Sequence, residues 1–448
     1  MPGYQDIRIQ LTCQQYVSDT PRIDEGKKLI ELPFHSAMEA KDVRCPLCHG
    51  RVQVHDHGTL RLKDMPLFPG YEQVLEMSFH RWKCRECGHE FNEGVPLKAD
   101  GARVTDRAAR WVATLLLHRL TIAGVSRITG IHWSTVKRLH GRLMGRTLES
   151  RRRELEESGY RPTLLAVDEF AVHKGHTYAT SVMDLGSGEV LWVGPGRGMA
   201  DFEKFFHDMD MRLLERVEAV AMDMNASYNR LVERHMPWAE VVYDRYHMQA
   251  QYGKDVMGQV RLDEARAHRE KAEALLGEAA EEPERGGRRA LKAEARREKA
   301  LYRELKGSRW LMLKGRGGLC EAEKDALGSI LEDHQALALC HAMKEELSAL
   351  FDLRDEQAAR EGWTRWFQAA KESGIPPLMD FARLKEKRIE GLVAHSRHPI
   401  GTGRLEGFNN KIKVAKRIAY GYRDDGYFFT LIRYLSLPSS KFSSPKKT

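Results

Sequence analysis

The chain has no long hydrophobic run and no recognisable targeting segment. None of its 448 residues lies in an apolar stretch long enough to cross a bilayer. The first residues, MPGYQDIRIQLTCQQ, lack the basic-then-apolar pattern of a signal peptide. These two absences argue against a membrane-spanning or secreted class, and we expect a cytoplasmic protein.

Cysteine is scarce, and its placement is informative. Only seven cysteines occur, and four of them form two C-x-x-C pairs, CPLC and CREC. In a cytoplasmic chain this pattern indicates metal rather than disulfides. Four thiolates satisfy tetrahedral Zn²⁺, and the alternating stretches between the pairs predict hairpin strands, so residues 1–100 are expected to form a zinc-ribbon domain. The predicted ligands are Cys45, Cys48, Cys84 and Cys87.

Two alternatives to this zinc site remain open. The C-x-x-C pairs are also typical of redox centres, although two such pairs in one chain are harder to explain that way. His49 and His89 lie close enough in sequence to substitute as ligands, but they rank below the cysteines.

Acidic residues are outnumbered by basic ones. The chain has 72 Lys and Arg against 64 Asp and Glu, a net charge of +8, which favours a polyanionic partner. Its length predicts two to four domains, and 42% hydrophobic with 30% charged residues is typical of a soluble globular protein.

Residues 101–150 are predicted to form a helix-turn-helix domain. A short helix at about 122–129 precedes Gly130, and a second helix begins near Trp133. The second helix buries one apolar side and exposes a polar one, which a major-groove helix would use. The predicted exposed side chains are Thr135, Lys137, Arg138, His140 and Arg142. A small helical bundle with a solvated basic face is the alternative.

From residue 161 onward the pattern changes to strands. Residues 161–253 contain three strand-like runs, a helix at about 199–216, the strand VEAVAMDM, another helix, and the strand AEVVYDRYHM. This order is the layout of an RNase H-like α/β sheet. Residues 254–395, rich in Ala, Glu, Lys, Arg and Leu, predict an all-α insertion. The catalytic domain resumes at 396–437, and 438–448 is a basic, Ser-rich tail that we expect to be disordered. The fold class is therefore multi-domain α+β.

Three carboxylates stand out by their position. Asp168 lies inside an apolar strand, where an unpaired acid is costly. Asp223 closes the fourth strand, and Glu406 lies on a late predicted helix, GTGRLEGFNNKIKVAKRIAYGYR, among six basic residues. Singly, each has an ordinary structural role as a strand-edge acid, a helix cap or a surface charge. Together, they are oxygen ligands suited to Mg²⁺ or Mn²⁺ and to two-metal-ion phosphoryl transfer.

The motifs CPLC…RWKCRECGHEF, DEFAVHKGHTYAT, AMDMNASY, VYDRYHM and GRLEGFNNKIKVAKRIAYGYR occur in this order across most of the chain. With the helix-turn-helix, they resemble the bacterial insertion-sequence DDE transposases of the ISL-three family. The resemblance implies an RNase H-like core with an Asp-Asp-Glu triad, which falls on Asp168, Asp223 and Glu406. It also implies binding to double-stranded DNA at terminal inverted repeats, cleavage of the ends, joining of the 3′-hydroxyl to target DNA, and assembly as a homodimer or higher oligomer, with no membrane partner, in the nucleoid-associated cytoplasm.

Other residues are weaker candidates. Glu169 points to the opposite face of its strand from Asp168. Asp244 and His247 are expected to end the fifth strand near the triad, where a structural strand-end role is as plausible as a catalytic one. Trp310 is a candidate for base stacking, although core packing is the favoured role. The predicted DNA contacts outside the helix-turn-helix are His173, Lys174, His176, Arg404, Asn410, Lys413 and Arg417.

Two alternative functions share these features. A DNA-binding regulator derived from a transposase would keep the zinc ribbon and the helix-turn-helix but not need the triad. A metal-dependent nuclease would keep the triad without strand transfer. All three acids are present, which favours an enzyme.

Overall fold

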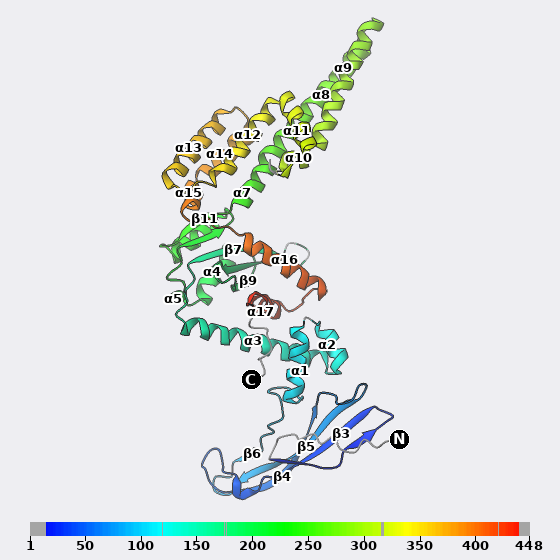
Figure 1. Cartoon of the computed structure of the whole chain (residues 1–448), viewed down its shortest axis with the longest axis vertical. Coiled ribbons are helices and arrows are strands. Elements are labelled where there is room, and N and C mark those ends of the chain that lie inside the picture. Colours follow the sequence, from blue (N-terminus) through cyan, green and yellow to red (C-terminus); the bar gives the residue numbers. More distant parts are fainter. Residues whose placement is uncertain are drawn as a thin grey trace. The chain divides into compact units, whose positions relative to one another are not determined.

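The computed structural model describes residues 15–118, 120–173, 175, 177–314, 318–419 and 421–438 (Figure 1). The chain divides into two compact units. The first comprises Met1–Glu154, Arg417–Tyr434 and Pro438–Thr448, and the second comprises Leu155–Lys416 and Leu435–Leu437. The predicted tail lies outside the described residues from position 439 onward.

The first unit begins with a six-stranded sheet. Its central order is β1-β3-β5-β4, with β2 paired to β3 and β6 paired to β5. Its elements are β1 (Tyr16–Ser18), β2 (Arg22–Asp24), β3 (Leu29–Ser36), the short helix η1 (Ala40–Asp42), β4 (Val52–Lys63), β5 (Glu72–Cys84) and β6 (Glu90–Asn92). The long hairpin of β4 and β5 confirms the predicted hairpin strands between the two cysteine pairs. Side chains alternate along β5, and Leu75, Met77 and Trp82 are fully buried.

Four helices complete the first unit. They are α1 (Asp106–Leu117), α2 (Ile122–Thr129), α3 (Trp133–Glu157), which continues into the second unit, and α17 (Asp425–Ser436), which also ends there. Thr105 and Thr121 cap α1 and α2 by accepting backbone N–H bonds from Ala108 and Gly124. Gly130 ends α2 with φ 63°, a left-handed conformation that favours glycine. The predicted helix-turn-helix is therefore present at α2 and α3.

The polar side of α3 differs in part from the prediction. His140 is buried, and its Nδ1 lies 2.5 Å from the hydroxyl oxygen of Tyr427 in α17. Burial lowers the pKa of His140 to about 4. The predicted exposure of His140 is wrong because α17, far away in sequence, covers this position. Lys137 is also engaged, because its Nζ donates to Asp424 at 2.7 Å.

The second unit is built on a five-stranded sheet of order β11-β10-β7-β8-β9. Strands β7, β8 and β9 are antiparallel neighbours, whereas β10 runs parallel to both β7 and β11. The strands are β7 (Leu164–His173), β8 (Thr177–Asp184), β9 (Val190–Pro195), β10 (Ala219–Met222) and β11 (Glu240–Tyr243).

One face of this sheet is covered by α4 (Met199–Asp208) and α6 (Ala226–His235). Leu165 and Val167 of β7 join the same buried cluster as Phe202, Phe205 and Leu231. The single helix predicted at about 199–216 is in fact two helices, α4 and α5 (Met211–Leu214). The break occurs because the carboxylate of Asp210 caps the second helix by accepting from the backbone N–H of Arg212.

The strand predicted for AEVVYDRYHM is too long. β11 ends at Tyr243, and α7 (Arg245–Tyr252) follows at once, with Asp244 as its N-cap. The Asp244 carboxylate accepts the backbone N–H of His247 at 2.9 Å, which starts a helix where apolar alternation alone predicts more strand. His247 consequently lies in the first turn of a helix rather than at the end of a strand.

Residues 254–395 are helical wherever they have regular secondary structure within the described part of the chain. The elements are η2 (Gly253–Met257), α8 (Gly258–Glu281), α9 (Arg285–Gly307), α10 (Arg309–Leu313), α11 (Glu321–Asp333), α12 (Gln335–Leu350), α13 (Glu356–Glu372), α14 (Pro376–Glu386) and α15 (Ile389–Arg397). Their common core includes the fully buried Trp363, Trp366 and Phe367. Helices α8 and α9 form a long antiparallel hairpin (Figure 1). Within the described residues, every helix is too short or too polar to cross a membrane.

Candidate active site

Three acids follow one another at the same level of the parallel strands. Ala166 of β7 pairs with Ala221 of β10, so Asp168 and Asp223 are two residues further along their strands in the same register. Met222 pairs with Tyr243 of β11, which places Asp244 beside Asp223. The carboxyl ends of parallel strands are where open α/β sheets place their functional groups. The sheet therefore gathers these three carboxylates at one edge.

Asp244 has a structural task at this edge. Its side chain is buried, and besides capping α7 it accepts the backbone N–H of Thr402 at 2.7 Å. It thereby ties the segment before α16 (Gly403–Ile418) to the end of β11. A buried carboxylate that accepts two backbone N–H bonds is satisfied without a metal.

Glu406 lies in the first turn of α16. The hydroxyl of Thr402 donates to Glu406 Oε1 at 3.0 Å, and the backbone N–H of Glu406 donates to the carbonyl of Thr402 at 2.8 Å. Leu405, Phe408 and Ile412 are buried on the other side of the helix, which is therefore amphipathic. The Glu406 carboxylate is thus held toward the sheet edge by its own helix start.

His247 lies between two of the acids. Its Nδ1 is 4.0 Å from Asp223 Oδ2, and its Nε2 is 3.5 Å from Glu406 Oε1. Ligand atoms of Asp244, His247 and Glu406 all lie within 4.8 Å of one another, a spacing at which one metal ion could be held. Asp223 and Glu406 therefore face the same imidazole, although they are far apart in sequence.

Asp168 completes the cluster. The pKa of its carboxyl is raised to about 6, chiefly by burial and also by the negative charge of Glu406, although the Glu169 backbone N–H and His247 act in the opposite direction. Its Oδ2 accepts the side-chain amide of Asn409 at 2.8 Å. A partly buried carboxylate close to other acids is typical of a site that receives a cation.

Glu169 points away from this cluster, as the alternation of a strand predicts. It pairs with Thr180 across β7 and β8, and the Thr180 hydroxyl is 2.9 Å from that of Tyr228 on the α6 side. Burial raises the pKa of Tyr228, and the charge of Glu169 adds to the effect.

The basic residues of α16 differ in their engagement. Arg404 donates to the carbonyls of Leu185, Gly186 and Ser187, so it braces the β8–β9 turn. Lys413 is exposed and reaches Asn410 Oδ1 at 3.2 Å. Asn410 and Arg417 are exposed as well.

Sequence reasoning missed two residues of this cluster, Asn409 and Thr402. Asn409 lies three positions after Glu406, which on a helix is an adjacent position, and this spacing is the signal that could have identified it. Thr402 precedes the helix, and only the fold brings it to Asp244. Of the loop after β7, Lys174 and His176 lie outside the described residues, and His173 is exposed.

The exposure of Trp310 contradicts the favoured prediction that this side chain packs in the core. Its side chain lies on α10 and is 70% exposed, so it does not pack in the core. The guanidinium of Arg309 lies 5.3 Å from the centre of the indole ring. The short α10 turns this side chain outward while Met312 takes the buried position.

The four cysteines of the first unit meet at one point. Their sulfur atoms all lie within 4.8 Å of one another, with Cys45 Sγ 3.6 Å from Cys87 Sγ and Cys48 Sγ 3.5 Å from Cys84 Sγ. A tetrahedron of sulfurs about 2.3 Å from a central Zn²⁺ has edges of roughly 3.8 Å. The backbone N–H groups of Cys87 and Glu86 approach Cys84 Sγ at 3.4 Å and lower its pKa to about 7. The cluster is compatible with zinc.

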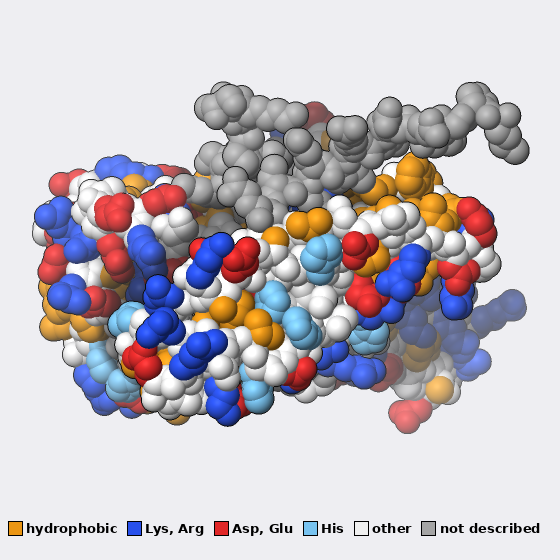
Figure 2. Space-filling view, turned by 90° about the horizontal axis from the view of Figure 1, so that it is seen from below, with side chains coloured by type: hydrophobic (Ala, Val, Ile, Leu, Met, Phe, Trp, Pro, Cys, Tyr) orange, Lys and Arg blue, Asp and Glu red, His pale blue; other side chains and the backbone are white. Residues whose placement is uncertain are grey.

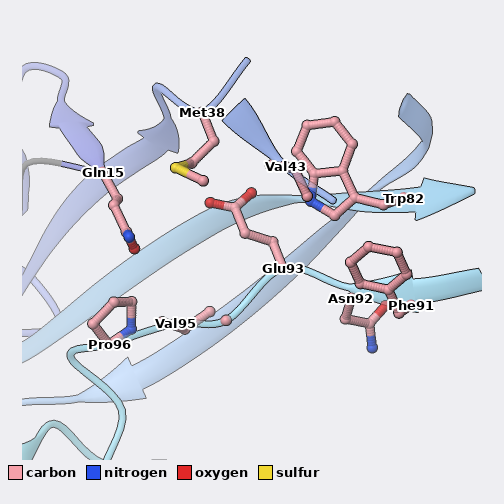
Figure 3. A pocket seen from close by; sticks show the side chains of 10 residues that line it. Gln15, Met38, Val43, Trp82, Phe91, Asn92, Glu93, Val95 and Pro96 are labelled. Carbon is pink, nitrogen blue, oxygen red and sulfur yellow. The ribbon is translucent and has the colours of Figure 1, made fainter. Parts of the chain in front are cut away.

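The same sheet borders a cavity of about 390 Å³ (Figure 3). Its lining includes Met38, Trp82 and Glu93. The buried Glu93 carboxylate accepts the Ser36 hydroxyl at 2.7 Å and the His80 backbone N–H at 2.9 Å, so its oxygens are already satisfied. All lining residues belong to the first unit, and none is a predicted site residue.

The predicted DNA-reading residues of α3 are partly committed to other contacts. Arg138 is exposed and Thr135 half-buried, while Lys137 binds Asp424 and Arg142 donates to the backbone carbonyl of Asp100. On the face drawn in Figure 2, basic, acidic and histidine side chains are interspersed.

Comparison with known proteins places this arrangement in a class. A family model described as "Transposase" matches residues 165–432, which include Asp168, Asp223 and Glu406. A model described as "Helix-turn-helix domain of transposase family ISL3" matches residues 93–139. The protein is therefore a transposase with a DNA-binding helix-turn-helix. Specifically, the chain belongs to the ISL3 family, the one that its motifs resemble.

Individual relatives agree with this assignment. The chain is 35% identical over 396 residues to the transposase for insertion sequence element IS1001 of Bordetella parapertussis, which covers 88% of this chain and 89% of that protein. It is 28% identical over 263 residues to the transposase for insertion sequence element IS1557 of Mycobacterium tuberculosis, covering 58% of this chain and 56% of that protein.

Proposed function

We propose that this transposase binds the terminal inverted repeats of its element, hydrolyses the phosphodiester at each end and joins the freed 3′-hydroxyl to target DNA. One observation carries the proposal. Asp168, Asp223 and Glu406 come from three distant segments. Asp168 and Asp223 lie in register on neighbouring strands, the ring of His247 lies 4.0 Å from Asp223 and 3.5 Å from Glu406, and the charge of Glu406 contributes to the raised pKa of Asp168.

The sheet supports an RNase H-like reading of the catalytic core. Three antiparallel strands are followed by two parallel ones, and the strand order is β11-β10-β7-β8-β9. In such a core, the first strand and the fourth strand carry the first two acids, and a late helix carries the third. We assign Asp168, Asp223 and Glu406 to these places, since β7, the end of β10 and α16 carry them.

The residues present fit a hard divalent cation. Asp168, Asp223 and Glu406 offer only oxygen donors, and Asp168 is partly buried near negative groups that a cation would neutralise. Mg²⁺ or Mn²⁺ bound there would supply charge for in-line phosphoryl transfer. The chain itself contributes orientation: Thr402 and Asn409 hold Glu406 and Asp168 by hydrogen bonds.

His247 acts as a near-site residue in this proposal. Its backbone is fixed by Asp244, and its ring faces Asp223 and Glu406. The imidazole is therefore placed to add a nitrogen donor or to bind a phosphate oxygen.

DNA recognition is assigned to the first unit. The start of α3, with the half-buried Thr135 and the exposed Arg138, suits a major-groove helix. The four cysteines would hold Zn²⁺ and so fix the N-terminal sheet as a zinc ribbon.

Lys413 and Arg417 would bind the DNA backbone beyond Glu406, and the exposed ring of Trp310 is available to stack on a displaced base. Synapsis of two ends favours at least a dimer.

A cleavage and joining assay on end-containing DNA with Mg²⁺ tests the proposal. The wild type should cut and join, and the variants Asp168→Ala, Asp223→Ala and Glu406→Ala should each bind the ends without cutting. Glu169→Gln is the matched control, because this neighbouring acid faces the other side of the sheet. Cutting by Glu406→Ala would overturn the triad, and cutting without joining in the wild type would identify a nuclease instead.

A further inference from the structure

Helix α9 carries an unusually regular row of cations. It contains nine Lys or Arg against three Glu, whereas its partner α8 contains four Lys or Arg against six Asp or Glu. Seven of the α9 cations recur at alternating spacings of four and three residues. This row, called the α9 stripe, comprises Arg285, Arg289, Lys292, Arg296, Lys299, Arg303 and Lys306. Spacings of three and four place them along one side of a helix.

All seven side chains of the α9 stripe are exposed. Within the described residues, no ion pair involves any of them. Cations on α8 behave differently: Arg266 pairs with Asp263, Arg269 with Glu273, and Lys271 with Glu298. The stripe is thus a line of charge that the fold leaves unneutralised, at a cost in self-repulsion.

The opposite side of α9 is firmly anchored. Glu298 is buried, and its carboxylate accepts Lys271 Nζ at 2.6 Å and lies 2.5 Å from His268 Nδ1. The guanidinium of Arg261 donates to the carbonyl of Leu305 at 2.7 Å. These contacts fix the rotation of α9 about its axis, so the stripe faces outward along its whole length.

Small residues border the stripe. Gly286, Ala293, Ala300 and Gly307 recur every seven residues on an adjacent line of the helix, and all are exposed. Because these side chains are small, a large partner molecule can approach the backbone of α9 closely. Beyond the end of α9, Arg309 and the 70%-exposed Trp310 follow directly.

We propose that the α9 stripe binds the phosphate backbone of double-stranded DNA without reading its sequence. This inference rests on the proposed function, since it names a second DNA contact of the same enzyme. The stripe spans 22 residues from Arg285 to Lys306, or about 32 Å of helix. At 3.4 Å per base pair this is the length of about nine base pairs.

The chemistry of the stripe favours DNA over an acidic protein. Four of its seven members are arginines, whose planar guanidinium matches phosphate oxygens. The stripe offers evenly spaced charge and no apolar anchor, whereas a stable protein interface is centred on buried apolar or aromatic residues. An extended, regular polyanion is the partner that such a line fits.

Salt-dependent binding to a duplex of unrelated sequence tests the proposal. The full-length variant Arg296→Gln, Lys299→Gln, Arg303→Gln loses three stripe charges and keeps good helix formers. If each cation binds one phosphate, the slope of log K against log salt should become shallower by about 2.7, and affinity at 0.1 M salt should drop by about 500-fold.

The matched control removes the same charge elsewhere in the helical region. Arg266→Gln, Arg269→Gln, Arg383→Gln alters exposed arginines that pair with acids of their own helices, and it should keep the wild-type slope. A wild-type slope and affinity in the stripe variant would overturn the proposal, as would an equal loss in the control. Because the readout is binding alone, failure of the wild type to cut end DNA would refute the catalytic proposal without affecting this test.

Discussion

At the scale of single residues, the acids at the sheet edge differ in how the fold treats them. Asp244 is buried and satisfied by two backbone N–H groups, and therefore needs no cation. Asp168 is largely buried with Glu406 nearby, and its pKa rises to about 6. Asp223 stays almost half exposed. Asp168 is thus the acid whose ionised form destabilises the fold most in the absence of metal. Destabilisation of this kind is typical of a functional position.

This cost leads to a stability prediction for Asp168→Asn without added divalent ions. The folded state binds the Asp168 proton more tightly than the unfolded state, so the contribution of this carboxyl to stability is present below about pH 4 and lost as the pH rises through about 6. At pH 8 the variant should gain roughly 1–2 kcal/mol, after the loss of one hydrogen bond is deducted. Amide hydrogen exchange of β7 should slow about tenfold.

The advantage of Asp168→Asn should disappear near pH 4, where the wild-type carboxyl is protonated. Asp223→Asn is the control, because this more exposed side chain has little desolvation to relieve. Unchanged or faster amide exchange of β7 at pH 8 would show that the ionised carboxylate of Asp168 does not destabilise the folded state. The variant should nevertheless fail to cut DNA, which separates stability from activity.

At the scale of elements, the N-terminal sheet depends on its two cysteine turns. Its six strands enclose two small buried clusters, one of which contains Cys45 and Cys84 themselves together with Val52 and Trp82. A small sheet of this kind gains much of its folding free energy from a structural ion.

Substitution of a single thiol should therefore release zinc and unfold this sheet. We expect purified wild type to carry one equivalent of zinc and Cys84→Ser to lose it, and the exchange protection of β4 and β5 to fall with it. Cys320→Ser, which changes an exposed thiol outside the cluster, should retain both. The zinc assignment fails if Cys84→Ser retains a full equivalent by elemental analysis.

Local sequence signals predicted some elements better than others. The helix-turn-helix was predictable because Thr121 and Gly130 mark the ends of α2 by capping chemistry that depends on few neighbours. The extent of β11 was not, since the Asp244 cap converts a strand-like run into a helix. His140 was misplaced because its cover, α17, arrives from nearly 300 residues away.

At the scale of the whole molecule, the candidate site could be predicted in its acids but not in its supports. Asp168, Asp223 and Glu406 stand out because each carries a charge where the local pattern is apolar, strand-terminal or basic. Thr402 and the ring position of His247 depend on tertiary contacts, which no local pattern reveals, and only the spacing of Asn409 from Glu406 points to that residue. Trp310 illustrates the same limit, because the sequence does not tell which side of the short α10 faces solvent.

The central claim is that Glu406, together with the two aspartates, holds a divalent ion during DNA cleavage. Thiolate ligands prefer softer metals than carboxylates do, so Glu406→Cys tests this claim directly in a cleavage assay with end-containing DNA. The account predicts that the variant is inactive with Mg²⁺ and that its ratio of Mn²⁺ to Mg²⁺ activity exceeds the wild-type ratio about tenfold or more. A variant that cuts with Mg²⁺ at the wild-type rate, with an unchanged ratio, would contradict it.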